Sequence, residues 1–232
     1  MSVYRYPNTR KYWAENSFEL IRQAMTRNRF QEIRRYLHFN DNANLLARDH
    51  PQFETIFKVR PTVEHFNKCF QSVPMSQRLC VDEQMCSTKV VSHLRQYMLA
   101  KPHKWVMKLF VLCDSYGYSY GFELYSGASD NVIPNEAPDL GAAANVVSRL
   151  SQIIHTHQNH IIYFYNFYTT LPLLVYLHSR GIFSLGTIRV NCIPNCKLST
   201  DKEVNKKNQR IFRRICRFML RCRFINHSVE GK

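Results

Sequence analysis

The chain has 232 residues, of which 45% are hydrophobic and 13% aromatic, so it has enough apolar material for one or two cores. This composition excludes an intrinsically disordered chain, and the longest apolar runs, residues 171–177 and 182–185, are too short to cross a bilayer. The 32 Lys and Arg residues outnumber the 17 Asp and Glu, for a formal net charge of +15. We therefore expect a soluble intracellular protein with a polyanionic partner, and nucleic acid is the first candidate.

The basic charge is concentrated at the two ends of the chain. Residues 1–79 carry 13 basic and 7 acidic groups, residues 80–201 carry 9 and 8, and residues 202–232 carry 10 and 2. A solvated surface is the ordinary explanation of such a charge run. Two basic flanks around a nearly neutral apolar block nevertheless favour contact with DNA.

Eight cysteines are present, but no Cys-x-x-Cys pair and no secretory signal accompanies them. Cys192 and Cys196 are four residues apart without a nearby pair of histidines, which is a weak zinc pattern. We therefore expect reduced, mostly buried thiols rather than disulfides or a structural metal.

Glycine is absent from the first 116 residues, which indicates a helical front and a turn-rich back that contains strands. Apolar side chains recur at helical spacing behind Ser17, and this pattern predicts one helix that Ser17 caps and that continues to residue 37. A second helix is predicted over residues 61–73, where Pro74 ends it.

Behind residue 78 the pattern changes to short strands. The predicted order is strands at 79–81, 106–113 and 118–125, with the turn 114–117 before the last, then helix 142–154, strand 161–164, helix 171–179 and strand 184–190. Three antiparallel strands followed by helix, strand, helix and strand predict an α/β (α+β) fold, with an RNase H-like mixed sheet behind a helical N-terminal region.

Six motifs in register resemble piggyBac transposases and their domesticated derivatives. They are MTRNRFQEIRRYLHFNDN (25–42), VDEQM (81–85), LRQY with KPHKW (94–97, 101–105), KLFVLCDSYG (108–117), YFYNFYTTLPLLVYL (163–177) and GTIR (186–189). The resemblance implies three parts. Residues 1–79 would be a helical dimerisation and DNA-binding region, residues 80–207 an RNase H-like core truncated before the insertion domain and the last catalytic helix, and residues 208–232 a basic tail outside the family.

In that family an RNase H-like fold cleaves and joins DNA with three aspartates that hold two divalent ions. The resemblance places the first acid at Asp82, at the end of the first strand, and the second at Tyr165. A neutral phenol is a poor Mg²⁺ ligand, and Asn166 should point away because strand side chains alternate. The third acid is expected beyond the end of this chain. We expect the ancestral Mg²⁺ site to be lost, with Asp82 a weak metal ligand at most and no other cofactor.

Smaller departures from the family lie nearby. Val90 and Val91 replace a Gly-Arg pair, while Lys89 is retained, and Cys192 replaces an arginine. Asp114 is interpreted as a turn residue rather than a substitute acid, because Asp-Ser-Tyr-Gly is a turn sequence. We expect Trp105 to pack in the core rather than stack on a base.

Phosphate recognition does not require the metal ligands, because it depends on surface Arg and Lys. The DNA-binding candidates are Arg22, Arg27, Arg29, Arg34 and Arg35 in the front helix, and Arg95, Lys101, Lys104 and Arg189 around the former active site. Residues 211–219 have the pattern of a basic amphipathic helix, and an unstructured appendage is an equal alternative.

The preferred hypothesis is a catalytically inactive, piggyBac transposase-derived nuclear protein that retains DNA binding and has no membrane or small-molecule partner. A homodimer remains an open alternative. An active DDE/DDD transposase with an atypical site would need replacements for Tyr165 and for the third acid. A decayed gene fragment without a selected role would leave one face of the sheet uncovered and tend to aggregate.

Overall fold

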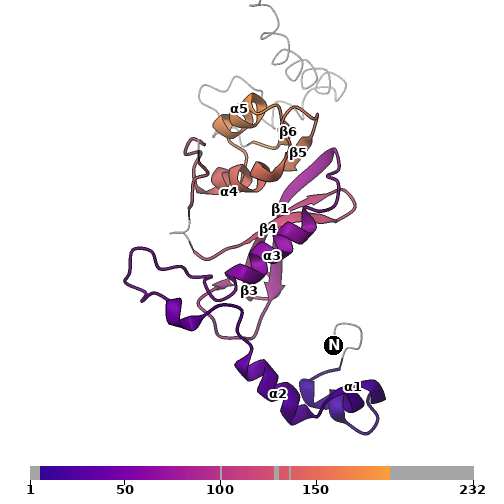
Figure 1. Cartoon of the computed structure of the whole chain (residues 1–232). Coiled ribbons are helices and arrows are strands. Elements are labelled where there is room, and N and C mark those ends of the chain that lie inside the picture. The colour runs from indigo at the N-terminus through magenta and orange to yellow at the C-terminus, as the bar shows by residue number, and fades with distance from the viewer. Residues whose placement is uncertain (1–5, 100, 128–130, 136, 189–232) are drawn as a thin grey trace, which may run out of the picture.

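The computed structural model describes residues 6–99, 101–127, 131–135 and 137–188 (Figure 1). The elements are the 3₁₀ helix η1 (Thr9–Trp13), α1 (Glu19–Ala24), α2 (Arg27–Tyr36), η2 (Asn42–Asn44), α3 (Arg60–Phe70), β1 (Arg78–Ser87), β2 (Arg95–Tyr97), β3 (Trp105–Asp114), β4 (Ser119–Leu124), α4 (Ala142–Leu150), η3 (Ser151–Ile153), β5 (Ile161–Phe164), α5 (Leu171–Ser179) and β6 (Phe183–Gly186). The predicted α/β class is confirmed, and the strands and helices predicted behind residue 78 occur in the predicted order. None of the helices within these ranges has the length and apolar character needed to cross a membrane.

The prediction of one continuous front helix capped by Ser17 is wrong, because the structure has two helices, α1 and α2, and Ser17 caps neither. The chain leaves helical geometry at Met25 and Thr26, and the Thr26 hydroxyl then caps α2. The Ser17 hydroxyl instead donates a hydrogen bond to the backbone carbonyl of Tyr12 in η1. The Trp13 indole stabilises the break by donating to the Met25 carbonyl at 2.8 Å. The apolar repeat continues through this break, so periodicity alone could not reveal it.

Helix α3 joins the helical front to the sheet. It has a proline in its first turn and ends at Phe70, three residues before the predicted end. The Asn67 side chain donates to the Phe122 carbonyl at 3.0 Å and accepts from the Phe122 N–H at 2.9 Å, so one amide pairs with both backbone groups of an edge-strand residue. These bonds anchor α3 on β4.

The described strands form a six-stranded mixed sheet in the order β2–β3–β1–β5–β6, with β4 also paired to β3. Strands β1 to β4 pair antiparallel, whereas β5 is parallel to both β1 and β6. The sequence missed β2, which has only three residues and no alternating pattern. Strand β6 begins and ends earlier than predicted, and residues 189–190 of that prediction lie outside the described residues.

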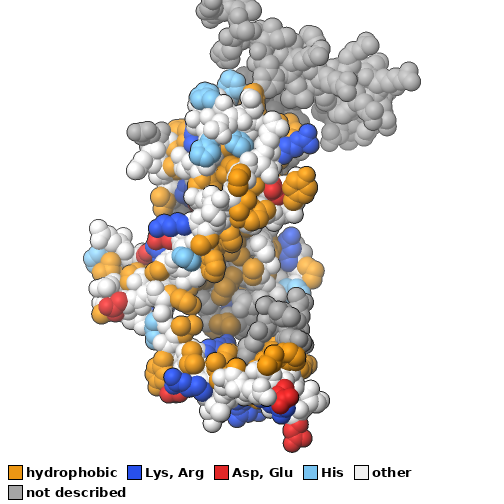
Figure 2. Space-filling model, turned by 45° about the vertical axis from the view of Figure 1, so that its right-hand side comes forward, with side chains coloured by type: hydrophobic (Ala, Val, Ile, Leu, Met, Phe, Trp, Pro, Cys, Tyr) orange, Lys and Arg blue, Asp and Glu red, His pale blue; other side chains and the backbone are white. Residues whose placement is uncertain are grey.

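Helices α4 and α5 cover one face of the sheet. Leu79 and Val81 from β1 join the buried core with side chains from both helices, while neighbouring residues on each strand point to the opposite face. On β6 the side chains of Phe183 and Leu185 point to that opposite face and keep 41% and 49% of their surface exposed. Hydrophobic side chains are also visible over the middle of the molecule in Figure 2.

The turn between β3 and β4 is organised by Asp114. Its carboxylate accepts hydrogen bonds from the backbone N–H groups of Tyr116 and Tyr118 and from the hydroxyls of Ser76 and Tyr120. Burial acts to raise the pKa of Asp114, but these hydrogen bonds outweigh it and lower the pKa below its ordinary value. The interpretation of Asp114 as a turn residue is confirmed.

Candidate functional site

The parallel pairing of β1 and β5 brings Asp82 and Tyr165 together. The last paired residues are Cys80 and Tyr163, and Asp82 and Tyr165 each lie two residues further along. The carboxyl ends of adjacent parallel strands meet at one edge, which is the usual place for a site in such sheets. Both residues line one open pocket of about 610 Å³, together with the exposed Lys101.

The expectation that β1 ends at Asp82 is wrong. The strand continues to Ser87, and Asp82 lies in mid-strand opposite Val111 of β3. The polar run after Val81 ended the predicted strand, but the long antiparallel partner β3 keeps these residues extended. The Asp82 side chain is exposed, and one of its oxygens accepts from the N–H of Glu83 at 2.7 Å.

The phenol of Tyr165 binds Glu83. The Tyr165 O–H donates to Glu83 Oε1 at 3.0 Å, and the Lys108 ammonium lies 2.8 Å from the same oxygen. The Glu83 and Lys108 side chains are only 12% and 13% exposed. Sequence analysis did not identify Lys108 or Glu83 as site residues. A charged residue inside an apolar strand was the available signal for Lys108, because such a charge needs a partner.

Aromatic rings surround the Lys108 ammonium. Its Nζ lies 4.7 Å from the ring centre of Phe110, 5.3 Å from that of Phe167 and 5.6 Å from that of Tyr125. Tyr165 stacks on Phe167 with ring centres 6.1 Å apart. Cation–π attraction therefore adds to the ion pair in holding Lys108 in place.

The chemistry of these donors does not fit a pair of Mg²⁺ ions. Burial, the hydrogen bond to Glu83 and the nearby negative charges raise the pKa of Tyr165 above its ordinary value, so the phenol is neutral at neutral pH. Glu83 is already paired with an ammonium, and the second carboxylate at this place, Asp82, accepts a hydrogen bond from the Glu83 N–H. Within the described ranges, no three His, Cys, Asp or Glu side chains converge on a common metal position. Two-metal catalysis depends on several converging carboxylates.

The turn that carries Tyr165 is held by a close approach of β6. The Thr169 hydroxyl donates to the Tyr165 carbonyl at 3.0 Å. A Cβ atom added to Gly186 would collide with the Thr169 hydroxyl and with the Phe164 ring. Gly186 comes from the GTIR motif, and its missing side chain makes room for this turn.

The basic candidates fall into separate groups. The five arginines of the front, one on α1 and four on α2, are exposed: Arg22, Arg27, Arg29, Arg34 and Arg35. Arg29 also pairs with Glu32 at 2.8 Å. Near the sheet Lys101 lines the pocket with Asp82, Lys104 is exposed, and Arg189 lies outside the described residues.

The expectation that Trp105 packs in the core is wrong. Trp105 is 42% exposed at the start of β3, and the Arg95 guanidinium lies 3.9 Å from its ring centre. Core packing rather than base stacking was the expectation for this tryptophan of the KPHKW motif. Trp105 is the first residue of β3 and pairs with Tyr97 of the short strand β2, and this position leaves the indole at the surface.

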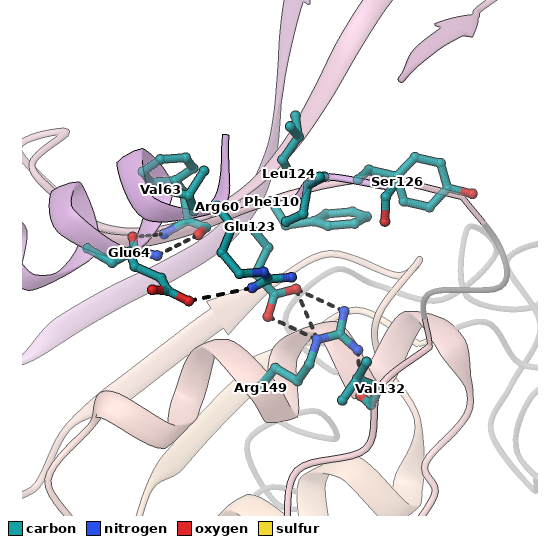
Figure 3. A pocket seen from close by; sticks show the side chains of 13 residues that line it. Arg60, Val63, Glu64, Phe110, Glu123, Leu124, Ser126, Val132 and Arg149 are labelled. Carbon is teal, nitrogen blue, oxygen red and sulfur yellow. Dashed lines mark hydrogen bonds and ion pairs between the residues drawn. The ribbon is translucent and has the colours of Figure 1, made fainter. Parts of the chain in front are cut away.

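A second pocket of about 320 Å³ lies between α3, β4 and α4 (Figure 3). Arg149 donates to both carboxylate oxygens of Glu123 and to the Val132 carbonyl, and Arg60 pairs with Glu54 and Glu64. These charges already satisfy one another, so the pocket is explained as a structural junction.

Residues 1–221 match the transposase IS4 family. The chain belongs to this family, among the piggyBac transposases. The resemblance inferred from the six motifs is thereby confirmed over most of the chain.

Two human proteins and one solved structure resemble this piggyBac-type chain. PiggyBac transposable element-derived protein 3 from Homo sapiens is 30% identical over 213 residues, which are 89% of this chain and 34% of that protein. PiggyBac transposable element-derived protein 2 from Homo sapiens is 29% identical over 215 residues, 89% of this chain and 35% of that protein. A piggyBac transposase in a cryo-EM synaptic complex with hairpin DNA is similar with a TM-score of 0.61 at 24% identity, over 79% of this chain and 36% of that chain. The fold is shared, and the chain spans about a third of the length of these relatives.

Proposed function

We propose that this piggyBac-type chain has an RNase H-like core that no longer cleaves DNA and that it retains DNA binding, in the nucleus. The observation that carries the proposal is the contact of Tyr165 with Glu83 beside Asp82. A phenol tied to a carboxylate occupies the place where the family resemblance puts the second metal-binding acid. The residues that remain can hold neither ion of a two-metal site well.

DNA binding is supported by charge and by the relatives. The arginines of α1 and α2 are exposed on the helical front, where phosphates can reach them, although Arg29 is paired with Glu32. The similar solved transposase is in a complex with hairpin DNA. We extend that partner to this chain as a proposal, and a homodimer is proposed on the same resemblance.

A salt titration tests the binding. If three to five arginines meet phosphates, affinity for a random-sequence duplex should fall by about 40- to 500-fold between 50 and 200 mM salt. Arg34→Gln with Arg35→Gln should weaken binding and reduce the slope. Lys58→Gln with Lys68→Gln removes the same charge from exposed positions outside α1 and α2 and serves as the matched control. Absent binding, or equal effects of the two pairs, would contradict this assignment.

A nicking assay tests the loss of cleavage. Supercoiled plasmid incubated with the chain and Mg²⁺ or Mn²⁺ should remain intact. Metal-dependent nicking that disappears in Asp82→Ala would instead establish the alternative of an active transposase with an atypical site.

The alternative of a decayed fragment draws support from the exposure of the apolar Leu185 side chain on β6. A decayed chain should aggregate or unfold without cooperativity. A single cooperative thermal transition that DNA shifts upward would refute decay, because a ligand stabilises only a folded state that binds it.

A further inference from the structure

An aromatic and basic surface lies at the paired ends of β2 and β3, and we name Arg95, Tyr97 and Trp105 the Trp105 platform. Tyr97 and Trp105 are directly paired across the two strands, with ring centres 5.0 Å apart and planes at 63°. They keep 50% and 42% of their surface exposed. The Arg95 guanidinium lies 3.9 Å from the indole centre. Cross-strand packing thus fixes two exposed rings and one cation in a single arrangement.

The Trp105 platform shares a face of the sheet with Asp82. Asp82 is paired with Val111, and Val111 and Trp105 are six residues apart on β3, so side-chain alternation puts all three on one face. The separation along the strand is about 20 Å at roughly 3.4 Å per residue.

The segment next to the platform is basic and anchored. The Met98 N–H donates to the Lys104 carbonyl at 2.7 Å, and the Lys101 N–H donates to the Met98 carbonyl at 3.2 Å. The Trp105 carbonyl accepts from the Thr88 N–H at 3.0 Å. Lys101 and Lys104 are exposed, and Lys104 directly precedes Trp105 in the chain.

We propose that the Trp105 platform stacks on an unpaired base of DNA while Arg95, Lys101 and Lys104 contact the adjoining phosphates. Every base has a π face, so stacking on an aromatic ring tolerates any sequence, and the neighbouring cations suit a polyanion rather than an apolar partner. A base inside a duplex is covered on both faces, so the surface selects frayed ends or single strands. This inference rests on the DNA binding proposed above and adds the form of DNA that is recognised.

Tryptophan fluorescence tests the stacking directly. The chain has two tryptophans, Trp13 and Trp105, so Trp13→Phe leaves Trp105 as the single indole reporter. Adding a single-stranded dT dodecamer should quench its emission. An abasic dodecamer, which has the phosphates without the bases, should quench it much less.

Affinity measurements separate stacking from folding. Trp105→Ala should weaken binding of the dT dodecamer by about fivefold to a hundredfold, and should change binding of a blunt 12-base-pair duplex by less than about twofold. Trp105→Phe keeps a ring at this position and should retain most of the affinity. Thermal unfolding of both variants establishes that each is folded.

The outcomes distinguish this inference from the proposed function. Duplex binding with no quenching, or with equal dT affinity in Trp105→Ala, overturns the stacking role alone. If Trp105→Ala loses equal affinity for duplex, dT and abasic DNA, Trp105 has a structural role and the stacking role is also overturned. Absence of all DNA binding refutes the proposed function and this inference together.

Discussion

Replacing Lys108 with methionine should destabilise the chain by leaving Glu83 without its ammonium. Methionine keeps the apolar stem among the rings and removes only the charge. Loss of one partner from a fully buried pair costs about 3–5 kcal/mol. Glu83 is 12% exposed and keeps the Tyr165 hydrogen bond, so we expect a smaller loss of about 2–3 kcal/mol in the free energy of unfolding. For a domain of this size the melting temperature should fall by about 4–12 °C.

The assay is a double-mutant cycle measured by denaturant and thermal unfolding. Glu83→Gln with Lys108→Met removes both charges, and its loss should be smaller than the sum of the two single losses by about 1–2 kcal/mol. Because the pair is shielded, the Lys108→Met effect should persist in 1 M NaCl. Lys104→Met, at an exposed lysine, is the control and should change stability by less than about 0.5 kcal/mol. Additive single effects would refute the assignment of Lys108 and Glu83 as a coupled pair.

Three further results are expected. Tyr165→Asp should not restore metal-dependent nicking, because one added carboxylate does not complete a two-metal site; a plasmid assay that shows nicking would contradict this. Gly186→Ala should lower the free energy of unfolding by about 1–3 kcal/mol, since its methyl group collides with Thr169, and a smaller residue at that contact, Thr169→Ala, should recover part of the loss. A hydrogen bond with Cys80 lowers the pKa of Cys113 to about 7, so its iodoacetamide alkylation should reach half its maximal rate near that pH, and Cys80→Ala should shift the midpoint upward.

The order of the elements behind residue 78 could be predicted because each of them except the three-residue β2 carries a local signal. A run of β-branched and aromatic residues located β5, and the helix predicted over residues 171–179 has the bounds of α5 in the structure. The misplaced boundaries have tertiary causes. The Trp13 contact interrupts the front helix, and pairing with β3 extends β1 beyond Asp82. A local pattern contains no information about either partner.

Sequence alone determined that this chain belongs to the piggyBac transposase family and that Tyr165 stands where the resemblance expects an acid, because motifs and their register are properties of residue order. Only the tertiary structure decided what the tyrosine contacts. Parallel pairing of β1 with β5 places Tyr165 beside Asp82. Lys108 on β3 forms an ion pair with Glu83 on β1, and Tyr165 donates its hydrogen bond to this paired carboxylate. The hydrogen bond between Tyr165 and Glu83 joins residues 82 positions apart, and the exposure of Trp105 likewise depends on which strands pair around it.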